Sequence, residues 1–278
     1  MLKLHIIIAY NNRKKQFLRT LNSFEKSIYS QNIIVIVVDD GSDVSNRLEN
    51  IVNDYSFEIR LIRIEGKIKT WTNPCVIYNI GFAQIDINET NNKIIIQNPE
   101  CFHYGDVIAH VEEHLNNENY LSYDCLSLPK WFDHSLIESD RLIKILTSTT
   151  ITSEQGNPEN QVLWYSHSKY KRKALHFCTA ISFLNLRHLN GFNLEYSNGH
   201  CYDDDEFFER IKQLGLNIDY VNGPFSIHQF HDMYRNSFSQ DDLIACEKNR
   251  ILLDNSLKNN LLSSRANRTS KFGLINNN

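Results

Sequence analysis

Candidate functional acids stand at three separate places in the sequence, and two histidines stand close together after the last of them. The acids are the pair Asp39-Asp40, the single residue Glu100 and the run 203–206, and the histidines are His228 and His231. Carboxylate and imidazole groups bind divalent metal ions, and a carboxylate can also take a proton from an alcohol. These residue types therefore suit metal-assisted chemistry and general base catalysis.

The polar groups in the first half of the chain follow short apolar runs. Runs of this kind, rich in β-branched residues, are typical of buried parallel strands. In a sheet of parallel strands, ligands bind beyond the carboxyl ends of the strands. We therefore expect these polar groups to lie together at one edge of a sheet. The runs are 4–9, 33–38 and 93–96, and the polar groups after them are 10–12, 39–40 and 98–100.

The elements that position these groups alternate between strand and helix. The helices are indicated by apolar residues that recur at helical spacing. Such alternation predicts a doubly wound parallel sheet. The predicted order is strand 4–9, helix 16–28, strand 33–38, helix 48–55, strand 59–64, helix 74–85 and strand 93–96.

The second half of the sequence is less regular. We predict helices at 106–116 and 204–214, strands at 120–128 and 218–221, and a mobile insertion over 133–160 with one helix near 136–146. Residues after about 238 are predicted to form one amphipathic helix and an Asn- and Ser-rich tail, and a tail of that composition is expected to be disordered.

Composition excludes several classes of protein. The formal net charge of −4 over 278 residues argues against nucleic acid as the main partner. Six cysteines without a Cys-X-X-Cys pair give no support for a zinc finger. Their scatter is typical of reduced thiols in a cytoplasmic protein, and their even number is also compatible with disulfides. No apolar run approaches 18 residues, so we expect no transmembrane segment. If its target is bound to a membrane, the protein must reach it peripherally, from solution.

Common phosphate-binding loops are absent. No Gly-X-Gly-X-X-Gly motif follows the first predicted strand, and the sequence has no Gly-X-X-X-X-Gly-Lys-Ser/Thr motif. The phosphates of a bound nucleotide would then need another source of positive charge. A divalent metal held by carboxylate and imidazole is the natural substitute.

The order of several short motifs resembles family 2 glycosyltransferases, over about residues 3–235. The later motifs resemble the galactosyltransferase-like and chondroitin-polymerase-like members of that family. The motifs are Ile-Ile-Ile-Ala-Tyr-Asn-Asn-Arg at 6–13, Val-Val-Asp-Asp-Gly-Ser at 37–42, Asn-Ile-Gly at 79–81, Gly-Phe-Asn at 191–193, Asp-Asp-Asp-Glu-Phe at 203–207, and Arg210.

The resemblance implies a GT-A fold, which is an α/β fold with a Rossmann-like, mostly parallel central sheet flanked by helices. It implies one glycosyltransferase domain at 1–237, divided into a nucleotide-binding half at 1–105 and an acceptor half at 106–237, with a C-terminal helix and tail at 238–278. The implied reaction is metal-dependent, inverting transfer of a sugar, with a UDP-sugar as the expected donor and Mn²⁺ or Mg²⁺ as the metal. The implied acceptor is a hydroxyl group on a glycan, a lipid-linked molecule or a protein.

The resemblance also assigns roles to residues. Asp204, with Asp203 as its neighbour, is expected to supply the general base, and Glu100 with His228 or His231 is expected to hold the metal. Residues expected to contact the nucleotide-sugar are Ala9, Tyr10, Asn12, Asp39, Asp40, Lys69, Asn79 and Asn98.

Two positions depart from the family pattern. Asn98-Pro99-Glu100 stands where the family has Asp-X-Asp, so Asn98 can offer only a neutral amide, to the metal or to the ribose. Tyr78 stands where the family has arginine, and Lys67 or Lys69 could replace that charge.

Each feature also has a purely structural interpretation. Asp-Asp-Gly-Ser forms turns, Pro99 can end a strand, and acids at a helix start complement its dipole. The histidines could be ordinary surface or core residues, and the aromatic group Trp164, Tyr165, His176 and Phe177 could be core or could stack on sugar rings.

Two other functions stay open. A nucleotidyltransferase has a similar sheet, but the Gly-rich, Arg-containing loop expected after its first strand is missing. A non-catalytic or metal-independent protein that binds nucleotide-sugars remains compatible with the altered Asp-X-Asp motif.

Overall fold

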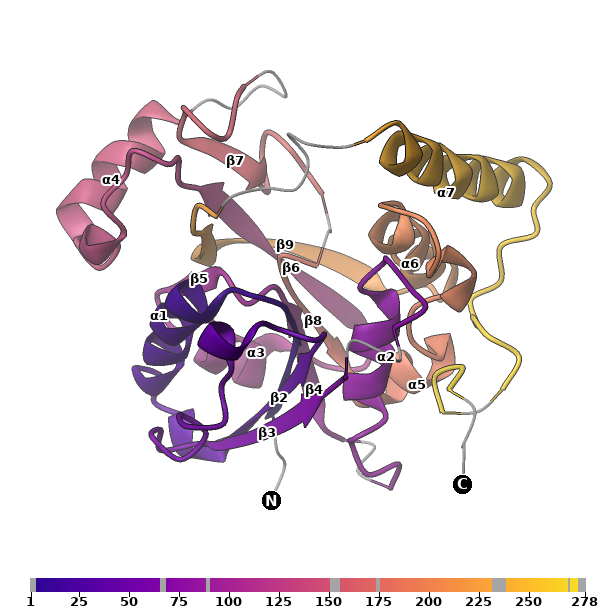
Figure 1. Ribbon diagram of the computed structural model, residues 1–278, viewed down its shortest axis with the longest axis horizontal. Coiled ribbons are helices and arrows are strands. Elements are labelled where there is room, and N and C mark those ends of the chain that lie inside the picture. Colours follow the sequence, from indigo (N-terminus) through magenta and orange to yellow (C-terminus); the bar gives the residue numbers. More distant parts are fainter. Residues whose placement is uncertain are drawn as a thin grey trace.

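A single curled sheet runs through the protein, with helices on both of its faces (Figure 1). The computed structural model describes residues 4–65, 69–88, 91–150, 156–173, 176–231, 239–269 and 271–274. Helices α1 (Lys14–Glu25) and α3 (Val107–His114) cover one face of the sheet. Helices α2 (Cys75–Phe82), α5 (Phe183–Leu189) and α6 (Asp203–Gln213) cover the other.

Four parallel strands form the first half of the sheet, in the order β3-β2-β1-β4. Their bounds agree with the prediction to within one residue, because continuous apolar runs are favoured where a strand is buried on both faces. The strands are β1 (Leu4–Tyr10), β2 (Ile33–Asp39), β3 (Glu58–Arg63) and β4 (Lys93–Gln97).

The prediction of a helix over residues 48–55 was wrong. Residues 49–56 form turns and bends, and Leu48 and Ile51 are nevertheless buried in the core below α1. Polar turn-forming residues lie between these apolar side chains, and their competition with the helical backbone explains the difference.

The second half of the sheet is mixed, so the expectation of a doubly wound parallel sheet holds only for β1–β4. The strand β8 pairs antiparallel with both β4 and β6, and β9 pairs parallel with β6 but antiparallel with β5. Only three residues separate β4 from β5, far fewer than a parallel crossover needs. The bounds are β5 (Cys101–Tyr104), β6 (Asn119–Ser127), β7 (Leu163–Ser166), β8 (Cys178–Ser182) and β9 (Asn217–His228).

The predicted mobile insertion over 133–160 is largely a packed lobe. Helix α4 (Asp140–Thr149) buries Ile143 and Leu146 against Phe132 and Trp164, the latter on β7 (Figure 1). Residues 151–155 lie outside the described ranges.

The C-terminal region continues with α7 (Gln240–Lys258), which lies beside α6, and with a segment that returns along α5 (Figure 1). We call residues 261–269 and 271–274 the C-terminal strap. Ala266 and Phe272 of the strap are 6% exposed, and the ring of Phe272 packs on Phe82 and Phe183. This packing contradicts the disorder expected of the tail for these residues. Within the described ranges, no helix combines the length and the apolar composition needed to cross a membrane.

Gly81 fixes how closely α2 packs on the sheet, which leads to a prediction. A Cβ atom at this position would lie 2.6 Å from the Cγ2 atom of Ile7 on β1. Alanine gains about 1 kcal/mol in helix propensity over glycine, but overpacking a core costs about 1–3 kcal/mol. We expect Gly81→Ala to lower the free energy of unfolding by about 1 kcal/mol in urea denaturation. A more stable variant would show that α2 moves away from β1 at little cost.

Candidate active site

The turns after β1 and β2 are joined to each other by hydrogen bonds. The backbone N–H of Asn12 donates to the Ser42 hydroxyl over 2.9 Å, and the Asn12 side chain accepts from the Asp43 N–H over 2.9 Å. Asn12 has a left-handed backbone (φ 49°), which asparagine tolerates better than most residues. The two turns therefore form one edge beyond the carboxyl ends of the parallel strands.

The two acids of this edge have different surroundings. Asp39 is fully buried, accepts a hydrogen bond from the Ser42 N–H over 2.8 Å and pairs with Arg63 at 2.9 Å. Asp40 is partly exposed, and its Oδ2 atom pairs with the Nζ atom of Lys69 at 2.6 Å. Its other oxygen, Oδ1, is buried and accepts no hydrogen bond in the structure. Asp40 therefore has one carboxylate oxygen without a hydrogen-bond partner, whereas Asp39 holds the turn and β3 together.

Between β4 and β5, a short turn carries Asn98 and Glu100. The side-chain oxygen of Asn98 accepts from the Tyr78 hydroxyl over 2.9 Å, and its backbone carbonyl accepts from the Cys101 N–H over 3.1 Å. This turn lies at the same end of the sheet as the Asp40 edge, because β4 runs parallel to β1 and β2. Asn98 and Glu100 are consequently well placed to meet a ligand held by Asp40.

Glu100, His228 and His231 come together as a cluster suited to a metal. The Glu100 Oε1 atom lies 3.3 Å from Nε2 of His228 and 3.2 Å from Nε2 of His231, and all three ligand atoms lie within 4.8 Å of one another. The pairing of β5 with β9 sets Cys101 opposite His228, which brings these distant parts of the chain together. Gln229 adds hydrogen bonds from its N–H and its side chain to the Glu100 carbonyl, both 3.1 Å long.

The charge states within this cluster suit a cation. Burial by itself raises the pKa of Glu100, but hydrogen bonds from His228 and His231 outweigh it and hold this pKa well below the usual value. Burial lowers the pKa of His228, so its imidazole is neutral and can act as a ligand. One carboxylate and two imidazoles form a donor set that suits Mn²⁺. This set is less suitable for Mg²⁺, because that ion prefers oxygen ligands.

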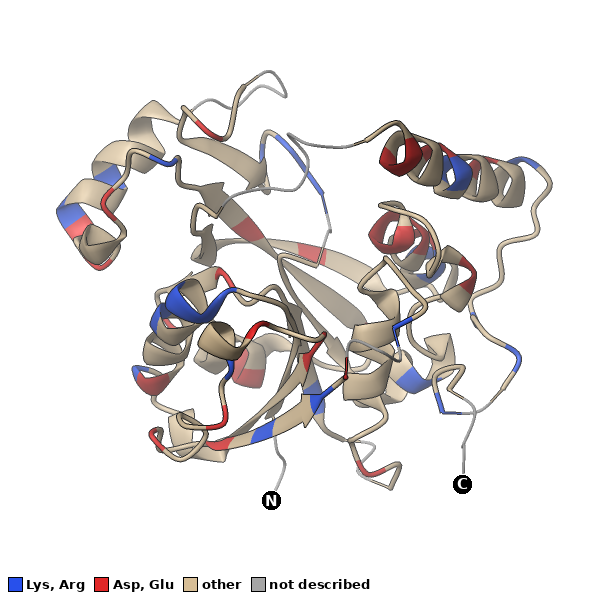
Figure 2. Cartoon of the chain, viewed as in Figure 1, with Lys and Arg blue, Asp and Glu red and all other residues tan. Residues whose placement is uncertain are grey.

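The acidic run occupies the first turn of α6, where Figure 2 shows it in red. Asp203 is buried and accepts a hydrogen bond from the Asn73 side chain over 2.9 Å, while its Oδ2 atom is buried without a partner. Burial, followed by the charge of Asp203, raises the pKa of Asp204. A carboxylate with a raised pKa takes up a proton more readily, which is what a general base requires.

The charges of both Glu100 and the acidic run 203–206 influence the pKa of Tyr78. Burial raises its pKa well above the usual value, and the charges of Glu100, Asp203 and Asp204 raise it further. The Tyr78 hydroxyl itself donates to Asn98, in the turn that carries Glu100. The sequence marked Tyr78 only as a departure from the family motif. No local signal distinguishes it, because nearly all residues of α2 are buried.

Some predicted ligand-binding residues have other roles. Asn79 is fully buried and its amide binds only backbone: Nδ2 donates to the carbonyls of Phe192 and Phe272, and Oδ1 accepts from the Phe192 N–H. It has no group left for a nucleotide, which corrects the prediction. The Tyr10 ring packs on Phe17 and its hydroxyl donates to the carbonyl of Asn46, so only its backbone adjoins the turn.

The other predicted positions are distributed as follows. Ala9 is half-buried and packs in the core beside α2, and Trp164 is buried. The rings of Tyr165 and Phe177 are half-buried and contact His228. The ring of His176 is half-buried and contacts Tyr78. Lys67 lies outside the described residues.

Comparisons with known proteins agree with this arrangement. A family model described as "Glycosyl transferase family 2" matches residues 5–71. No curated protein sequence matches the chain.

Solved structures share the fold at low sequence identity. TarS 1–349 of S. aureus in complex with UDP-GlcNAc has a TM-score of 0.53 at 14% identity, over 86% of this chain and 61% of that one. Glucosyl-3-phosphoglycerate synthase of Mycobacterium tuberculosis, solved with Mn²⁺ and UDP-glucose, has a TM-score of 0.50 at 11% identity, over 85% and 74%. Mannosyltransferase PcManGT of Pyrobaculum calidifontis, solved with GDP-Man and Mn²⁺, has a TM-score of 0.50 at 13% identity, over 81% and 56%.

The chain spans 37% of one TarS chain and 60–61% of two shorter ones. The sequence match lies within β1 to β3 and the turns that carry Asn12 and Asp40, and the structural match extends over most of the chain. The protein therefore has the GT-A fold of these solved glycosyltransferases, and residues 5–71 resemble the glycosyl transferase family 2.

Proposed function

We propose that this protein transfers a sugar from a UDP-sugar to a hydroxyl group of an acceptor, with Mn²⁺ as cofactor and with inversion at the anomeric carbon. The observation that carries the proposal is the cluster of Glu100, His228 and His231 beside Asn98. It lies at the same end of the sheet as Asp40, and the Tyr78 hydroxyl that donates to Asn98 is influenced by the charges of both Glu100 and Asp204. These three groups match the three needs of the reaction, which are nucleotide recognition, charge neutralisation and proton removal.

The nucleotide would lie on the edge formed by the turns after β1 and β2. A uracil N3–H can donate to the free Oδ1 atom of Asp40, which would otherwise stay buried without a partner. Lys69, paired with Asp40, adds a positive charge at the same edge. Asn12 and the backbone of Ala9 and Tyr10 shape the turn against which the nucleoside would rest.

The metal would be held by Glu100, His228 and His231, and Asn98 would contact the diphosphate or the ribose. When bound, Mn²⁺ supplies the positive charge that stabilises the diphosphate as it leaves. Two imidazoles with one carboxylate is also a donor set known for Zn²⁺, so a test of metals should include that ion.

The chain's own residues would move the proton. The oxygen of the acceptor hydroxyl forms a bond to the anomeric carbon while the bond from that carbon to the diphosphate oxygen breaks. The hydroxyl proton passes to the carboxylate of Asp204, and UDP leaves with the electron pair of the broken bond. Direct displacement from the opposite side inverts the configuration, and the base needs only to be ionised and within hydrogen-bond reach.

The nucleotide site leads to a prediction about Asp40. We expect Asp40→Ala to weaken UDP binding ten- to a hundredfold, because a charge-assisted hydrogen bond contributes about 1.5–3 kcal/mol. Isothermal titration calorimetry measures this directly. Asp54→Ala is a suitable control, since Asp54 is an exposed acid outside this edge. Equal UDP affinity in Asp40→Ala and the wild type would remove Asp40 from the nucleotide site.

The proposed function as a whole is tested by a turnover screen of nucleotide-sugars with Mn²⁺, in which released nucleoside diphosphate and glycosylated acceptor are both measured. We expect turnover with at least one UDP-sugar, and loss of turnover with EDTA. Binding of UDP-sugars without any release of UDP would instead identify a non-catalytic nucleotide-sugar-binding protein.

A further inference from the structure

Asn249 is a buried polar residue on a helix that is otherwise largely exposed. It lies on α7 and is 1% exposed, and Leu253 is the other buried residue described on that helix. The Asn249 side-chain nitrogen donates to the carbonyl of Tyr196 over 3.1 Å and to the carbonyl of Cys201 over 3.0 Å. Both of its N–H bonds are thus committed to the loop that leads into α6.

The loop and α7 are shaped to meet at this residue. A Cβ atom added to Gly199 would overlap the side-chain amide of Asn249, so the contact requires a glycine at this position. About two turns away along α7, the Oδ1 atom of Asp242 lies 3.0 Å from Nε2 of His200. The loop is therefore held from α7 by at least two side chains.

The backbone between this loop and α6 has an uncommon conformation. Cys201 and Tyr202 both have left-handed backbones, with φ values of 60° and 66°, and Tyr202 provides no side-chain cap to the helix. Left-handed residues other than glycine persist only where their surroundings hold them, and such strain is concentrated at functional sites. The residues that follow directly are Asp203 and Asp204.

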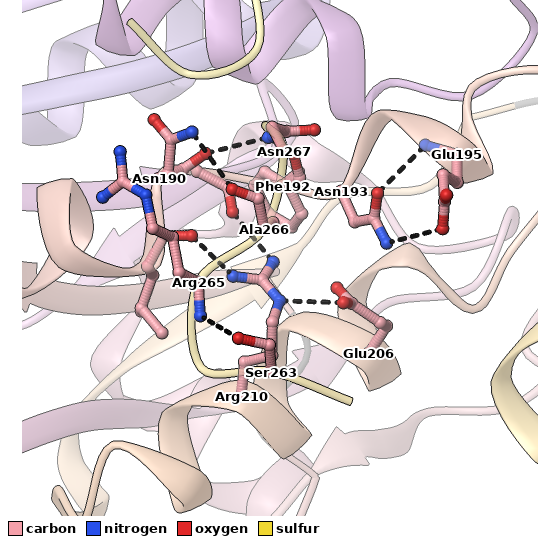
Figure 3. A network of polar contacts seen from close by, with 12 residues as sticks. Asn190, Phe192, Asn193, Glu195, Glu206, Arg210, Ser263, Arg265, Ala266 and Asn267 are labelled. Atoms are coloured by element: carbon pink, nitrogen blue, oxygen red, sulfur yellow. Dashed lines mark hydrogen bonds and ion pairs between the residues drawn. The ribbon is translucent and has the colours of Figure 1, made fainter. Parts of the chain in front are cut away.

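The rest of α6 is fixed separately. Arg210 is fully buried, pairs with Glu206 at 2.8 Å and donates to the carbonyls of Leu189 and Gly191 over 3.0 and 2.8 Å. The C-terminal strap holds the same stretch from its other side, where the side chain of Asn267 donates to the carbonyls of Asn190 and Phe192 (Figure 3). Arg210 and the strap therefore fix the later turns of α6, whereas Asn249 holds the backbone that leads into its first turn, where Asn73 also binds Asp203.

We propose that Asn249 is a positioning residue for the reaction, which fixes Asp203 and Asp204 by holding the left-handed junction in front of them. This inference rests on the proposed function, because it assumes that Asp204 acts as the base. Asn249 touches neither carboxylate. It acts through the carbonyl of Cys201, two residues before Asp203.

The test is the substitution Asn249→Asp, which keeps the size of the side chain and removes both N–H donors. We expect kcat to fall ten- to a hundredfold, since a displacement of about 1 Å in a reacting group has an effect of up to that size. The KM for the donor and the calorimetric affinity for UDP should change less than twofold, because the nucleotide edge lies on other elements. Asn255→Asp is the matched control: Asn255 lies on the same helix and is exposed, and this variant should behave as the wild type.

A second substitution keeps the test informative if Asn249→Asp does not fold. Gly199→Ala leaves Asn249 in place but pushes its amide away from the loop, and it should lower kcat in the same way. Thermal denaturation of each variant establishes that it is folded at the assay temperature. If neither variant folds, the contact serves folding and the positioning role is overturned.

A double variant separates positioning from a general structural defect. Residues that act through one catalytic group are not additive, so Asn249→Asp should lower the residual rate of Asp204→Asn by less than twofold. If the two losses multiply, or if UDP affinity falls together with kcat, Asn249 has only a structural role. If Asp204→Asn has no effect by itself, the base assignment fails and the positioning role with it. If Asp204 is essential and Asn249→Asp keeps the normal kcat, only the present inference fails.

Discussion

Replacing Asp204 by asparagine should lower the rate of sugar transfer by about a hundredfold or more, as expected for loss of a general base. Asparagine keeps the size and polarity of the side chain but cannot accept the proton. UDP binding should remain nearly unchanged, because Asp204 lies in the first turn of α6 and the proposed nucleotide site is on the turns after β1 and β2. Transfer assays and calorimetry on the same protein measure both quantities.

The pH dependence gives a second readout of the same group. Because burial and the neighbouring Asp203 raise the pKa of Asp204, the rate should fall as the pH drops through a value above the ordinary 3.8 of an aspartate. This acidic limb of the profile should be absent in Asp204→Asn. Asp205→Asn is the matched control within the same run of acids. If Asp203→Asn abolishes transfer while Asp204→Asn does not, the base is Asp203; if neither matters, the acids only stabilise the helix start.

Replacing Glu100 by glutamine, or removing metal with EDTA, should lower turnover by about a thousandfold. A metal ion contributes several kcal/mol to the stabilisation of a leaving diphosphate, and each 1.4 kcal/mol corresponds to a factor of ten. The loss should be specific to Glu100, and Glu113→Gln, a change at an exposed acid of α3, should have no effect. Comparing Mn²⁺, Mg²⁺ and Zn²⁺ in the wild type identifies the ion. Full turnover in EDTA would show that the reaction does not need a metal.

The sequence predicts the first four strands of the sheet well, because their signals are local. The strands β1 and β2 are continuous runs of isoleucine and valine, which are typical of strands buried on both faces. The polar groups after them follow from the topology, since parallel strands end at the same edge. The strand β8, in contrast, has only five residues and no distinctive pattern, so local signals do not identify it.

Contacts between residues far apart in the chain could not be predicted from local sequence patterns. His228 reaches Glu100 because β9 pairs with β5 over a separation of more than a hundred residues, and the resemblance alone suggested the contact in advance. Asn79 was assigned to the ligand because a motif names a residue without giving the direction of its side chain. The composition of the C-terminal strap suggested disorder, yet its Asn267 binds backbone groups of the loop between α5 and α6.

Calorimetric titration of UDP with and without Mn²⁺ tests the proposed metal site most directly. If Glu100, His228 and His231 hold a metal that bridges to the diphosphate, Mn²⁺ must strengthen UDP binding and UDP must strengthen Mn²⁺ binding by the same factor. We expect this coupling in the wild type and its loss in Glu100→Gln. Equal UDP affinity with and without Mn²⁺, or a coupling that survives in Glu100→Gln, would contradict the proposed metal site and the mechanism built on it.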